Sequence, residues 1–267
     1  MHAPEPPSLH VSIRRSRPIL LLLALLAAPI APARADELRV LAAGATESTL
    51  RDVVATFEAQ SGHALKLTYG AVGLLRDRIF SGEGADLVIV TPAIIEQLEA
   101  KALLQPGSRV DLGRVGGGIA VRAGERLPAV GSPEELRQAL LAAEEVYYAD
   151  PATATAGAFF LSVADRLGVG EAVRRKGRTA AGGKEAMRRM ARSSAHAIGL
   201  TQISEILSVT EVVLVGPYPA PLQTATTYSG VVPKAAARPD AAQAFLRFLM
   251  SPPVQKRFRK AGFEAAR

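Results

Sequence analysis

Short apolar segments alternate with amphipathic segments along most of the chain. The first apolar segment, residues 38–42, is followed by a stretch in which Leu50, Val53, Val54 and Phe57 recur at helical spacing. This pattern predicts a buried strand followed by a helix whose apolar face packs against it.

The same alternation continues to residue 102. Residues 64–69 alternate as a second strand, and residues 86–90 are apolar enough for a central parallel strand. Helices are expected up to Ile79 and over residues 93–102. A repeated strand–helix order predicts a parallel sheet with helices on both faces.

The second half of the chain carries clearer turn signals. Ser132 is suited to cap a helix, Pro133 to occupy its first position, and Glu135 to close a capping box. Further strands are predicted over 118–122, 145–149, 197–200, 211–215 and 226–232. Further helices are predicted over 157–167, after Gly183, over 241–248 and around 254–258.

The N-terminal segment has the composition of an export signal. Arg14, Arg15 and Arg17 precede an apolar run over 19–28, and the small-x-small cleavage pattern follows at 33–35. The run is too short to span a bilayer, which needs about 20 residues. We therefore predict a cleavable signal peptide over residues 1–35 and a periplasmic protein. The residues around the arginine pair favour the Sec route over the twin-arginine route; a retained anchor is the remaining alternative.

The charge and residue inventory excludes several functions. The 267 residues carry a formal charge of +7, and cleavage after Ala35 removes four basic residues and one acidic residue, which leaves +4. This is a weak indication of an anionic partner, and no nucleic-acid-binding motif accompanies it. The absence of cysteine excludes disulfides and thiolate sites. No catalytic motif is present, so we expect no enzyme activity, no cofactor and no metal.

Several segments resemble known families. The C-terminal stretch from Phe245 to Pro252, followed by Gln255 and Phe258, resembles the ending of many periplasmic solute-binding proteins. Four earlier segments, taken in order, resemble the periplasmic molybdate-binding protein family. They are Val40 to Ala45, Gly73 to Ile79, Gly84 to Ile89 and Asp150 to Gly157.

The resemblance implies an α/β, two-lobed periplasmic-binding-protein type II fold. Each lobe would be a mostly parallel sheet flanked by helices, and the chain would cross between lobes twice, near 116–121 and 225–232. Lobe 1 would comprise residues 36–115 plus 226–267, and lobe 2 residues 116–225.

The implied function is that of the solute-binding component of an ABC importer. The protein would be a monomer that captures a small oxyanion such as molybdate or tungstate and delivers it to a permease in the inner membrane. The alternatives are another small anion or polar solute, a sensor module, or an enzyme on the same scaffold.

Four strand-to-helix junctions offer a site for an anion, independently of the family. They lie at residues 44–46, 71–73, 156–157 and 183–184, where small residues let backbone N–H groups approach a ligand. The candidate ligand-binding residues are Ala45, Thr46, Tyr69, Val72, Gly73, Thr155, Ala156, Lys184 and Gln202.

The expected side-chain ligands differ from the family pattern. Two serines and a tyrosine that hold the oxyanion in the family correspond here to Ala45, Val72 and Gln202. Nearby hydroxyl groups, such as those of Tyr69 and Thr155, could replace them. A site built on hydrogen bonds discriminates through such groups, so the sequence determines the scaffold better than the ligand.

Other polar residues are expected to be structural. His63 and His196 lack the neighbours of a metal site, and the basic segment 174–178 is expected to be a solvated face that could contact the permease or lipid. Asp86 and Asp150 are expected to stabilise local structure, although Asp150 also keeps a possible role in the site.

Overall fold

The computed structural model describes residues 1–4 and 37–266. All its helices and strands belong to the unit Ala35–Arg267. Residues 5–35 of the predicted signal peptide, with its cleavage site, lie outside the described residues. Every helix in the described ranges is too short or too polar to cross a lipid bilayer.

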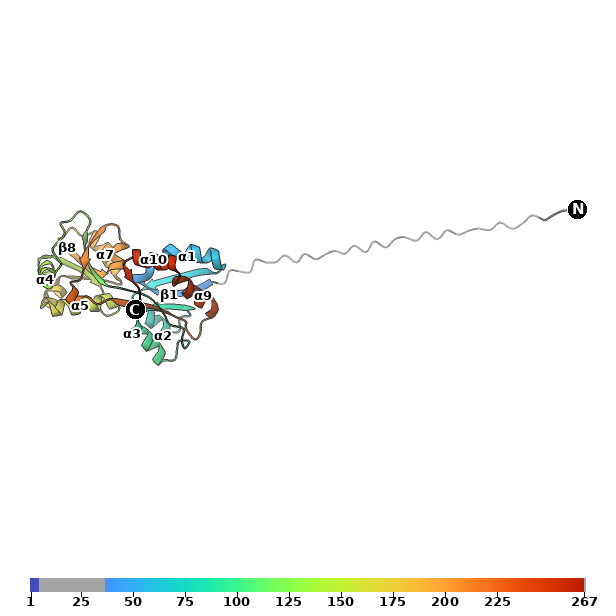
Figure 1. Ribbon diagram of the computed structural model, residues 1–267, viewed down its shortest axis with the longest axis horizontal. Coiled ribbons are helices and arrows are strands. Elements are labelled where there is room, and N and C mark those ends of the chain that lie inside the picture. Colours follow the sequence, from blue (N-terminus) through green and yellow to red (C-terminus); the bar gives the residue numbers. More distant parts are fainter. Residues whose placement is uncertain (5–36, 267) are drawn as a thin grey trace. The chain divides into compact units, whose positions relative to one another are not determined.

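Two β-sheets organise this unit (Figure 1). The first has the strand order β11-β4-β10-β3-β1-β2. Its strands are β1 (Glu37–Ala43), β2 (Ala64–Gly70), β3 (Leu87–Val90), β4 (Val110–Val115), β10 (Thr226–Val231) and β11 (Phe263–Glu264). The helices in the same part of the chain are η1 (Gly44–Thr46), α1 (Glu47–Ser61), α2 (Val72–Phe80), α3 (Pro92–Ala100), α9 (Pro239–Leu249) and α10 (Pro252–Lys260).

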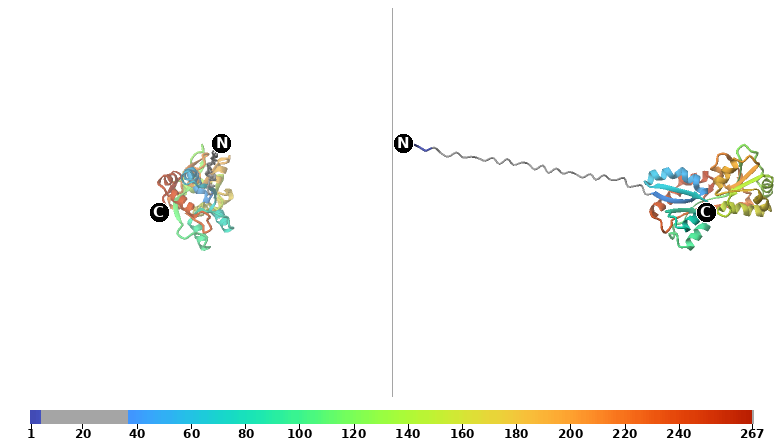
Figure 2. Two further views of the ribbon diagram at one scale, coloured as in Figure 1. Left: turned by 90° about the vertical axis from the view of Figure 1, so that its right-hand side faces the viewer. Right: turned by 180° about the vertical axis from the view of Figure 1, so that it is seen from behind.

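The second sheet has the strand order β7-β6-β8-β5-β9. Its strands are β5 (Gly117–Arg122), β6 (Glu145–Ala149), β7 (Gly177–Ala180), β8 (Ala197–Gln202) and β9 (Val212–Pro217). The remaining helices are α4 (Pro133–Ala142), α5 (Thr155–Arg166), α6 (Gly170–Lys176), α7 (Gly183–Ala191), α8 (Ile203–Leu207) and η2 (Ala220–Leu222). We refer to the first sheet with its helices as lobe 1 and to the second as lobe 2. The view from behind in Figure 2 shows the same grouping of elements.

The sheets are mixed, whereas the sequence predicted mostly parallel ones. Strand β1 pairs in parallel with β2 and β3, and β6 pairs in parallel with β7 and β8. The pairs that β10 forms with β3 and β4, and those that β5 forms with β8 and β9, are antiparallel. The reason is topological: β4, β5, β9 and β10 lie at the two passages between the sheets, so they are not connected to their neighbours by a right-handed strand–helix–strand crossover.

Each lobe has its own hydrophobic core. Phe57 of α1 lies in the core of lobe 1, with its ring centroid 4.7 Å from that of Phe245 and 5.3 Å from that of Phe248. In lobe 2, Phe160 of α5 is fully buried, and its ring meets the edge of Tyr148 at 5.1 Å. Burial of each such side chain contributes about 1.5–3 kcal/mol. The separate cores make each lobe a stable support for the loops between them.

The predicted capping box at Ser132 is confirmed. Its hydroxyl oxygen accepts from the Glu135 N–H at 3.2 Å, and the Glu135 carboxylate accepts from the Ser132 N–H at 2.9 Å. Together these bonds satisfy two donors that the first turn of α4 would otherwise leave without partners.

Candidate functional site

A cavity of about 230 Å³ lies between the two lobes. Its lining includes the carboxyl ends of β1 and β2 from lobe 1 and of β6 from lobe 2. In open α/β sheets, this end of the strands is where loops feed helix N-termini and where ligands bind. The volume is below the range of about 300–1,000 Å³ that is usual for drug-sized ligands, so the cavity suits a small solute.

Four helical segments begin at this cavity. Residues at the start of η1 and α1, of α2, of α5 and of α7 all line it: Gly44, Ala45, Glu47, Ala71, Val72, Thr155, Ala156, Gly183 and Lys184. The N–H groups of a helix's first turn have no intrahelical acceptor, and the helix dipole places partial positive charge there. Four such ends around one cavity produce a setting that favours negative charge.

Most of the predicted site residues line this cavity. They are Ala45, Tyr69, Val72, Thr155, Ala156 and Lys184. Ala45 and Val72, which the sequence comparison aligned with hydroxyl-bearing positions of the molybdate-binding family, are apolar residues of the cavity lining, and Tyr69 adds a phenol from the end of β2.

Thr46 and Gly73 lie beside the cavity and do not line it. Thr46 is fully buried, and its Oγ1 donates to the Ala43 carbonyl at 2.8 Å, so its hydroxyl has a local partner. The Gly73 N–H donates to the Thr153 carbonyl of lobe 2 at 3.0 Å, and a Cβ at Gly73 would lie 2.8 Å from that oxygen. Gly73 thus makes a close backbone contact between the lobes instead of offering its N–H to a ligand.

Gln202, predicted to lie opposite the ligand, instead joins the two passages between the lobes. Its side-chain amide lies 3.0 Å from the Val115 carbonyl, 3.1 Å from the Gly116 carbonyl and 3.1 Å from the Thr226 hydroxyl. With the amide nitrogen toward the two carbonyls, all three contacts are hydrogen bonds. Gln202 therefore ties β8 to the segments that lead from β4 into β5 and into β10.

An ion pair crosses the cavity between the starts of two helices. Lys184 Nζ of α7 lies 3.1 Å from Glu47 Oε1 of α1, and both side chains are largely buried. The same Oε1 accepts from Arg51 Nε at 2.8 Å. Burial alone would raise the pKa of Glu47, but the hydrogen bonds from Arg51 and Lys184 outweigh it, so the pKa is lowered.

Glu205 is a cavity residue that sequence reasoning missed. Its side chain lines the cavity although the residue is only 7% exposed, and its Oε2 accepts from Thr201 Oγ1 at 2.5 Å. The Thr201 hydroxyl and the backbone N–H groups of Gln202, Gly183 and Lys184 lower the pKa of Glu205, but burial raises it more. Glu205 occupies the third position of α8, where a glutamate reaches back to the N-cap N–H, but nothing local indicates that the cavity lies beyond.

Two tyrosines of lobe 1 add hydroxyl groups to the cavity lining. The Tyr69 hydroxyl is buried and, within the described part of the chain, has no hydrogen-bond partner. Tyr228 of β10 lines the same cavity. Burial raises the pKa of both hydroxyls, so both are neutral donors at physiological pH. A buried donor without a partner is costly, and a ligand in the cavity would supply the acceptor for Tyr69.

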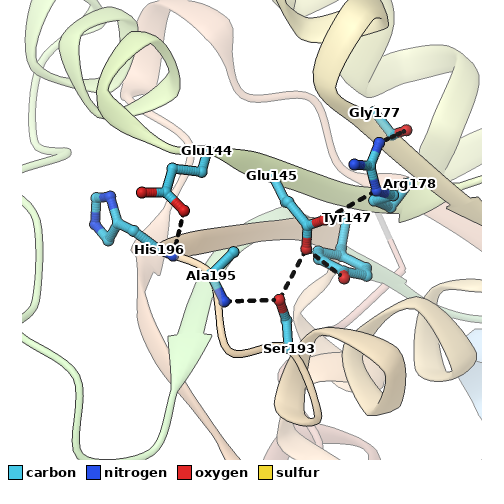
Figure 3. A network of polar contacts seen from close by, with 8 residues as sticks. All are labelled: Glu144, Glu145, Tyr147, Gly177, Arg178, Ser193, Ala195 and His196. Atoms are coloured by element: carbon cyan, nitrogen blue, oxygen red, sulfur yellow. Dashed lines mark hydrogen bonds and ion pairs between the residues drawn. The ribbon is translucent and has the colours of Figure 1, made fainter.

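The polar residues of the basic segment 174–178 and His196 make local contacts within lobe 2. Arg178 donates to Glu145 at 3.0 Å, and Tyr147 and Ser193 also donate to that carboxylate, in a network that Figure 3 shows at the edge of the sheet. The backbone N–H of His196 donates to Glu144 in the same view. Arg174 makes two bonds of 2.8 Å with Asp165. In the described ranges, no group of three or more His, Cys, Asp or Glu residues is placed to hold a metal.

The aspartates also have structural contacts. The Asp86 carboxylate accepts from the Arg39 N–H at 2.9 Å and from the Arg238 N–H at 3.0 Å. The Asp150 carboxylate accepts from the Ala152 N–H at 2.9 Å in the turn before α5. Asp86 thus links segments far apart in the sequence, and Asp150 orients the loop that leads to the cavity.

Comparison with known proteins gives relatives of one architecture. The periplasmic molybdate-binding protein of Azotobacter vinelandii has a TM-score of 0.73, 19% identity, and coverage of 86% of this chain and 100% of that one. The sulfate-binding protein SubI of Mycobacterium tuberculosis has a TM-score of 0.71, also at 19% identity, over 86% and 87% of the two chains. At these identities the likeness shows the fold, which is the predicted type II periplasmic-binding fold.

A relative with higher sequence identity is named for an enzyme activity. The aconitate isomerase of a Pseudomonas species is 29% identical over 235 residues, which cover 85% of this chain and 87% of the relative. The bacterial extracellular solute-binding protein family matches residues 38–264, nearly all of the folded unit. The chain therefore belongs to the bacterial extracellular solute-binding protein family.

Proposed function

We propose that this protein captures a small anion in the cavity between its lobes and presents it to an ABC permease. The observation that carries the proposal is the convergence of four helix starts on one cavity of about 230 Å³. Their N–H groups and dipoles favour an anion without requiring an excess of basic side chains. Lys184, the Tyr69 hydroxyl and Thr155 add side-chain donors at the same place.

A molybdate-like or tungstate-like oxyanion is the ligand class that the family resemblance supports. At Ala45 and Val72 such an anion would meet backbone donors without the neighbouring hydroxyls. At α7, the carboxyl group of Glu205 lies beside Gly183, so an anion there would meet a carboxyl group as well as the N–H groups of the helix start. Both features favour an alternative ligand within the same function. This ligand is a small polycarboxylate, which offers more contact surface than a compact tetrahedral ion.

A titration of the purified mature protein tests the proposal. Molybdate, tungstate, sulfate, phosphate, citrate and trans-aconitate are added in turn, and heat of binding and melting temperature are recorded. At least one anion should bind at a single saturable site and raise the melting temperature, by the amount that its affinity and concentration dictate. The absence of binding by every anion would contradict anion capture and leave the fold unaffected.

A pair of variants localises the site. Lys184→Gln removes a cavity donor, so the affinity for the bound anion should fall about 10- to 100-fold, as expected for a charge-assisted hydrogen bond. Lys256→Gln, at an exposed position on α10, is the matched control and should bind like the unaltered protein. Equal losses in both variants would argue against this cavity.

Isomerisation of an unsaturated polycarboxylate is a second candidate function. One observation favours it: an enclosed carboxyl group with a raised pKa, Glu205, lines the cavity and has the properties of an acid–base group. The name of the Pseudomonas relative indicates the substrate to try. Incubation with cis-aconitate should then yield trans-aconitate, which is detected by proton NMR. The rate of this conversion should fall at least 100-fold in Glu205→Gln. Binding of aconitate without any conversion would leave capture as the function.

A further inference from the structure

We infer that Glu205 is a ligand-contacting residue that meets the captured anion as a neutral carboxylic acid and donates a hydrogen bond to it. This inference rests on the proposed capture of an anion in the cavity. It assigns to one residue a dependence of affinity on pH, which does not follow from the helix starts alone.

The position of the carboxyl group is the first step. One oxygen, Oε2, accepts from the Thr201 hydroxyl at 2.5 Å. The other, Oε1, lies on the side of lobe 1, 3.3 Å from where a Cβ on Gly44 would stand. Because Glu205 lines the cavity and Gly44 has no side chain, Oε1 faces the space between the starts of η1 and α7.

The second step concerns the donors at α7. The Glu205 carboxyl group lies at the start of α7, where its Oε2 is 2.1 Å from the position that a Cβ on Gly183 would take, and the backbone N–H groups of Gly183 and Lys184 lower its pKa. An anion at the start of α7 therefore lies beside this carboxyl group. A carboxylate beside a bound anion places two negative groups together, which favours a proton on one of them.

The other charged and titratable groups around Glu205 do not remove this conflict. Lys184 of α7 directs its ammonium to Glu47 of α1 at 3.1 Å, and that carboxylate adds negative charge. Tyr228 of β10 is neutral, because burial raises the pKa of its hydroxyl. Arg188 of α7 lines the cavity but is exposed to solvent.

The enclosure of Glu205 acts in the same direction before any anion arrives. Burial raises the pKa of its carboxyl group more than the Thr201 hydrogen bond and the nearby backbone N–H groups lower it. The proton comes from solvent. With the proton on Oε1, the group still accepts the Thr201 hydrogen bond on Oε2 and offers a donor to the cavity.

The test measures affinity as a function of pH. Molybdate and trans-aconitate are titrated into the full mature protein from pH 5 to 9, in pairs of buffers with different heats of ionisation. We expect the affinity to be flat at low pH and to fall by about tenfold per pH unit once free Glu205 ionises, with uptake of one proton per anion in that range. The infrared difference spectrum of the complex should contain the band of a protonated carboxyl group.

Glu205→Gln is the decisive variant, since its amide keeps the donor and cannot titrate. It should bind within about threefold of the unaltered protein at pH 6, lose the pH dependence, and lack the infrared band. Glu96→Gln, at an exposed position on α3, is the control and should titrate like the unaltered protein. If the anion itself titrates in this pH range, the resulting change in affinity should be the same in both variants.

The outcomes separate this inference from the proposed function. If neither anion binds at any pH, anion capture by this cavity and the inference fail together. If an anion binds with constant affinity from pH 5 to 9, no proton uptake and no protonated-carboxyl band, the role of Glu205 is wrong and capture stands.

Discussion

Lys184 Nζ lies 3.1 Å from Glu47 Oε1, and the two residues are 137 positions apart in the sequence. Each stands at the beginning of a helix, Glu47 in lobe 1 and Lys184 in lobe 2, and both line the cavity. The pair therefore links the lobes at the place where an anion would bind. A ligand that takes Lys184 as its partner must compete with Glu47.

The first prediction follows from that competition. In Glu47→Gln, the Lys184 ammonium loses an ionised partner and becomes more available to a ligand, so affinity for the captured anion should increase by about three- to tenfold. Isothermal titration calorimetry checks this, with Glu96→Gln as the control. A decrease in affinity would show that Glu47 positions Lys184 and does not compete for it.

The second prediction concerns acid stability. The pKa of Glu47 is lowered in the folded protein, so its ion pair contributes stability above the unfolded-state pKa near 4.5, and this contribution is lost as the pH falls through the folded value. The free-energy difference between the unaltered protein and Glu47→Gln should therefore shrink between pH 5 and pH 3. Urea unfolding at each pH measures it, and a difference that stays constant would contradict the ion-pair account.

Glu205 should affect stability with the opposite sign. Its pKa is raised on folding, so its favourable contribution is fully present below the unfolded-state value of 4.5 and is lost as the pH rises through the folded value. We expect Glu205→Gln to gain stability relative to the unaltered protein as the pH rises from 4 to 8. Urea unfolding of the ligand-free proteins measures this trend, and a trend in the other direction would mean that the hydrogen bonds outweigh burial.

Two adjacent glycines allow a matched test of the packing around Glu205. A Cβ at Gly183 would lie 1.8 Å from Thr201 Oγ1 and 2.1 Å from Glu205 Oε2, whereas one at Gly182 would meet nothing within 4 Å. Gly183→Ala should lower the free energy of unfolding by about 1–3 kcal/mol and weaken anion binding. Gly182→Ala should stay within about 0.5 kcal/mol of the unaltered protein. Thermal and urea unfolding of both variants decide the comparison.

The final prediction concerns Gln223, which lies beside the passage from β4 to β5. Its Oε1 accepts from the Gly117 N–H at 2.9 Å, and its Nε2 donates to the Gly117 carbonyl at 2.7 Å. Gln223→Ala leaves both backbone groups without this partner, so the free energy of unfolding should fall by about 1–3 kcal/mol. Gln60→Ala, at an exposed position on α1, should have little effect in the same urea unfolding measurement.

Local features of the fold were predictable from the sequence, because they depend on neighbours in the chain. The spacing of Leu50, Val53 and Phe57 specifies the buried face of α1, and Ser132 with Glu135 specifies the start of α4. Strand β6 was predicted with its observed bounds, Glu145–Ala149. The junctions at the cavity followed from the rule that ligands lie beyond the carboxyl ends of strands.

Elements without a strong local pattern were missed. Strand β4 includes Asp111 and Arg114 among its apolar residues, and β7 is a four-residue strand, Gly177–Ala180. Each forms because a partner strand supplies its hydrogen bonds: β10 and β11 for β4, and β6 for β7. Such pairing depends on chain segments far away, so a local pattern cannot reveal it.

The chemistry of the cavity was decided by the tertiary structure. The sequence placed Lys184 at a helix start, but only the folded chain brings it to Glu47. The sequence placed Gln202 opposite the ligand, and the fold instead brings its amide to the carbonyls of Val115 and Gly116. Glu205 became a cavity residue because the starts of η1 and α7 enclose its carboxyl group. Periodicity determines which face of an element is buried, whereas the charge and hydrogen-bond partners of a site depend on which distant elements meet there.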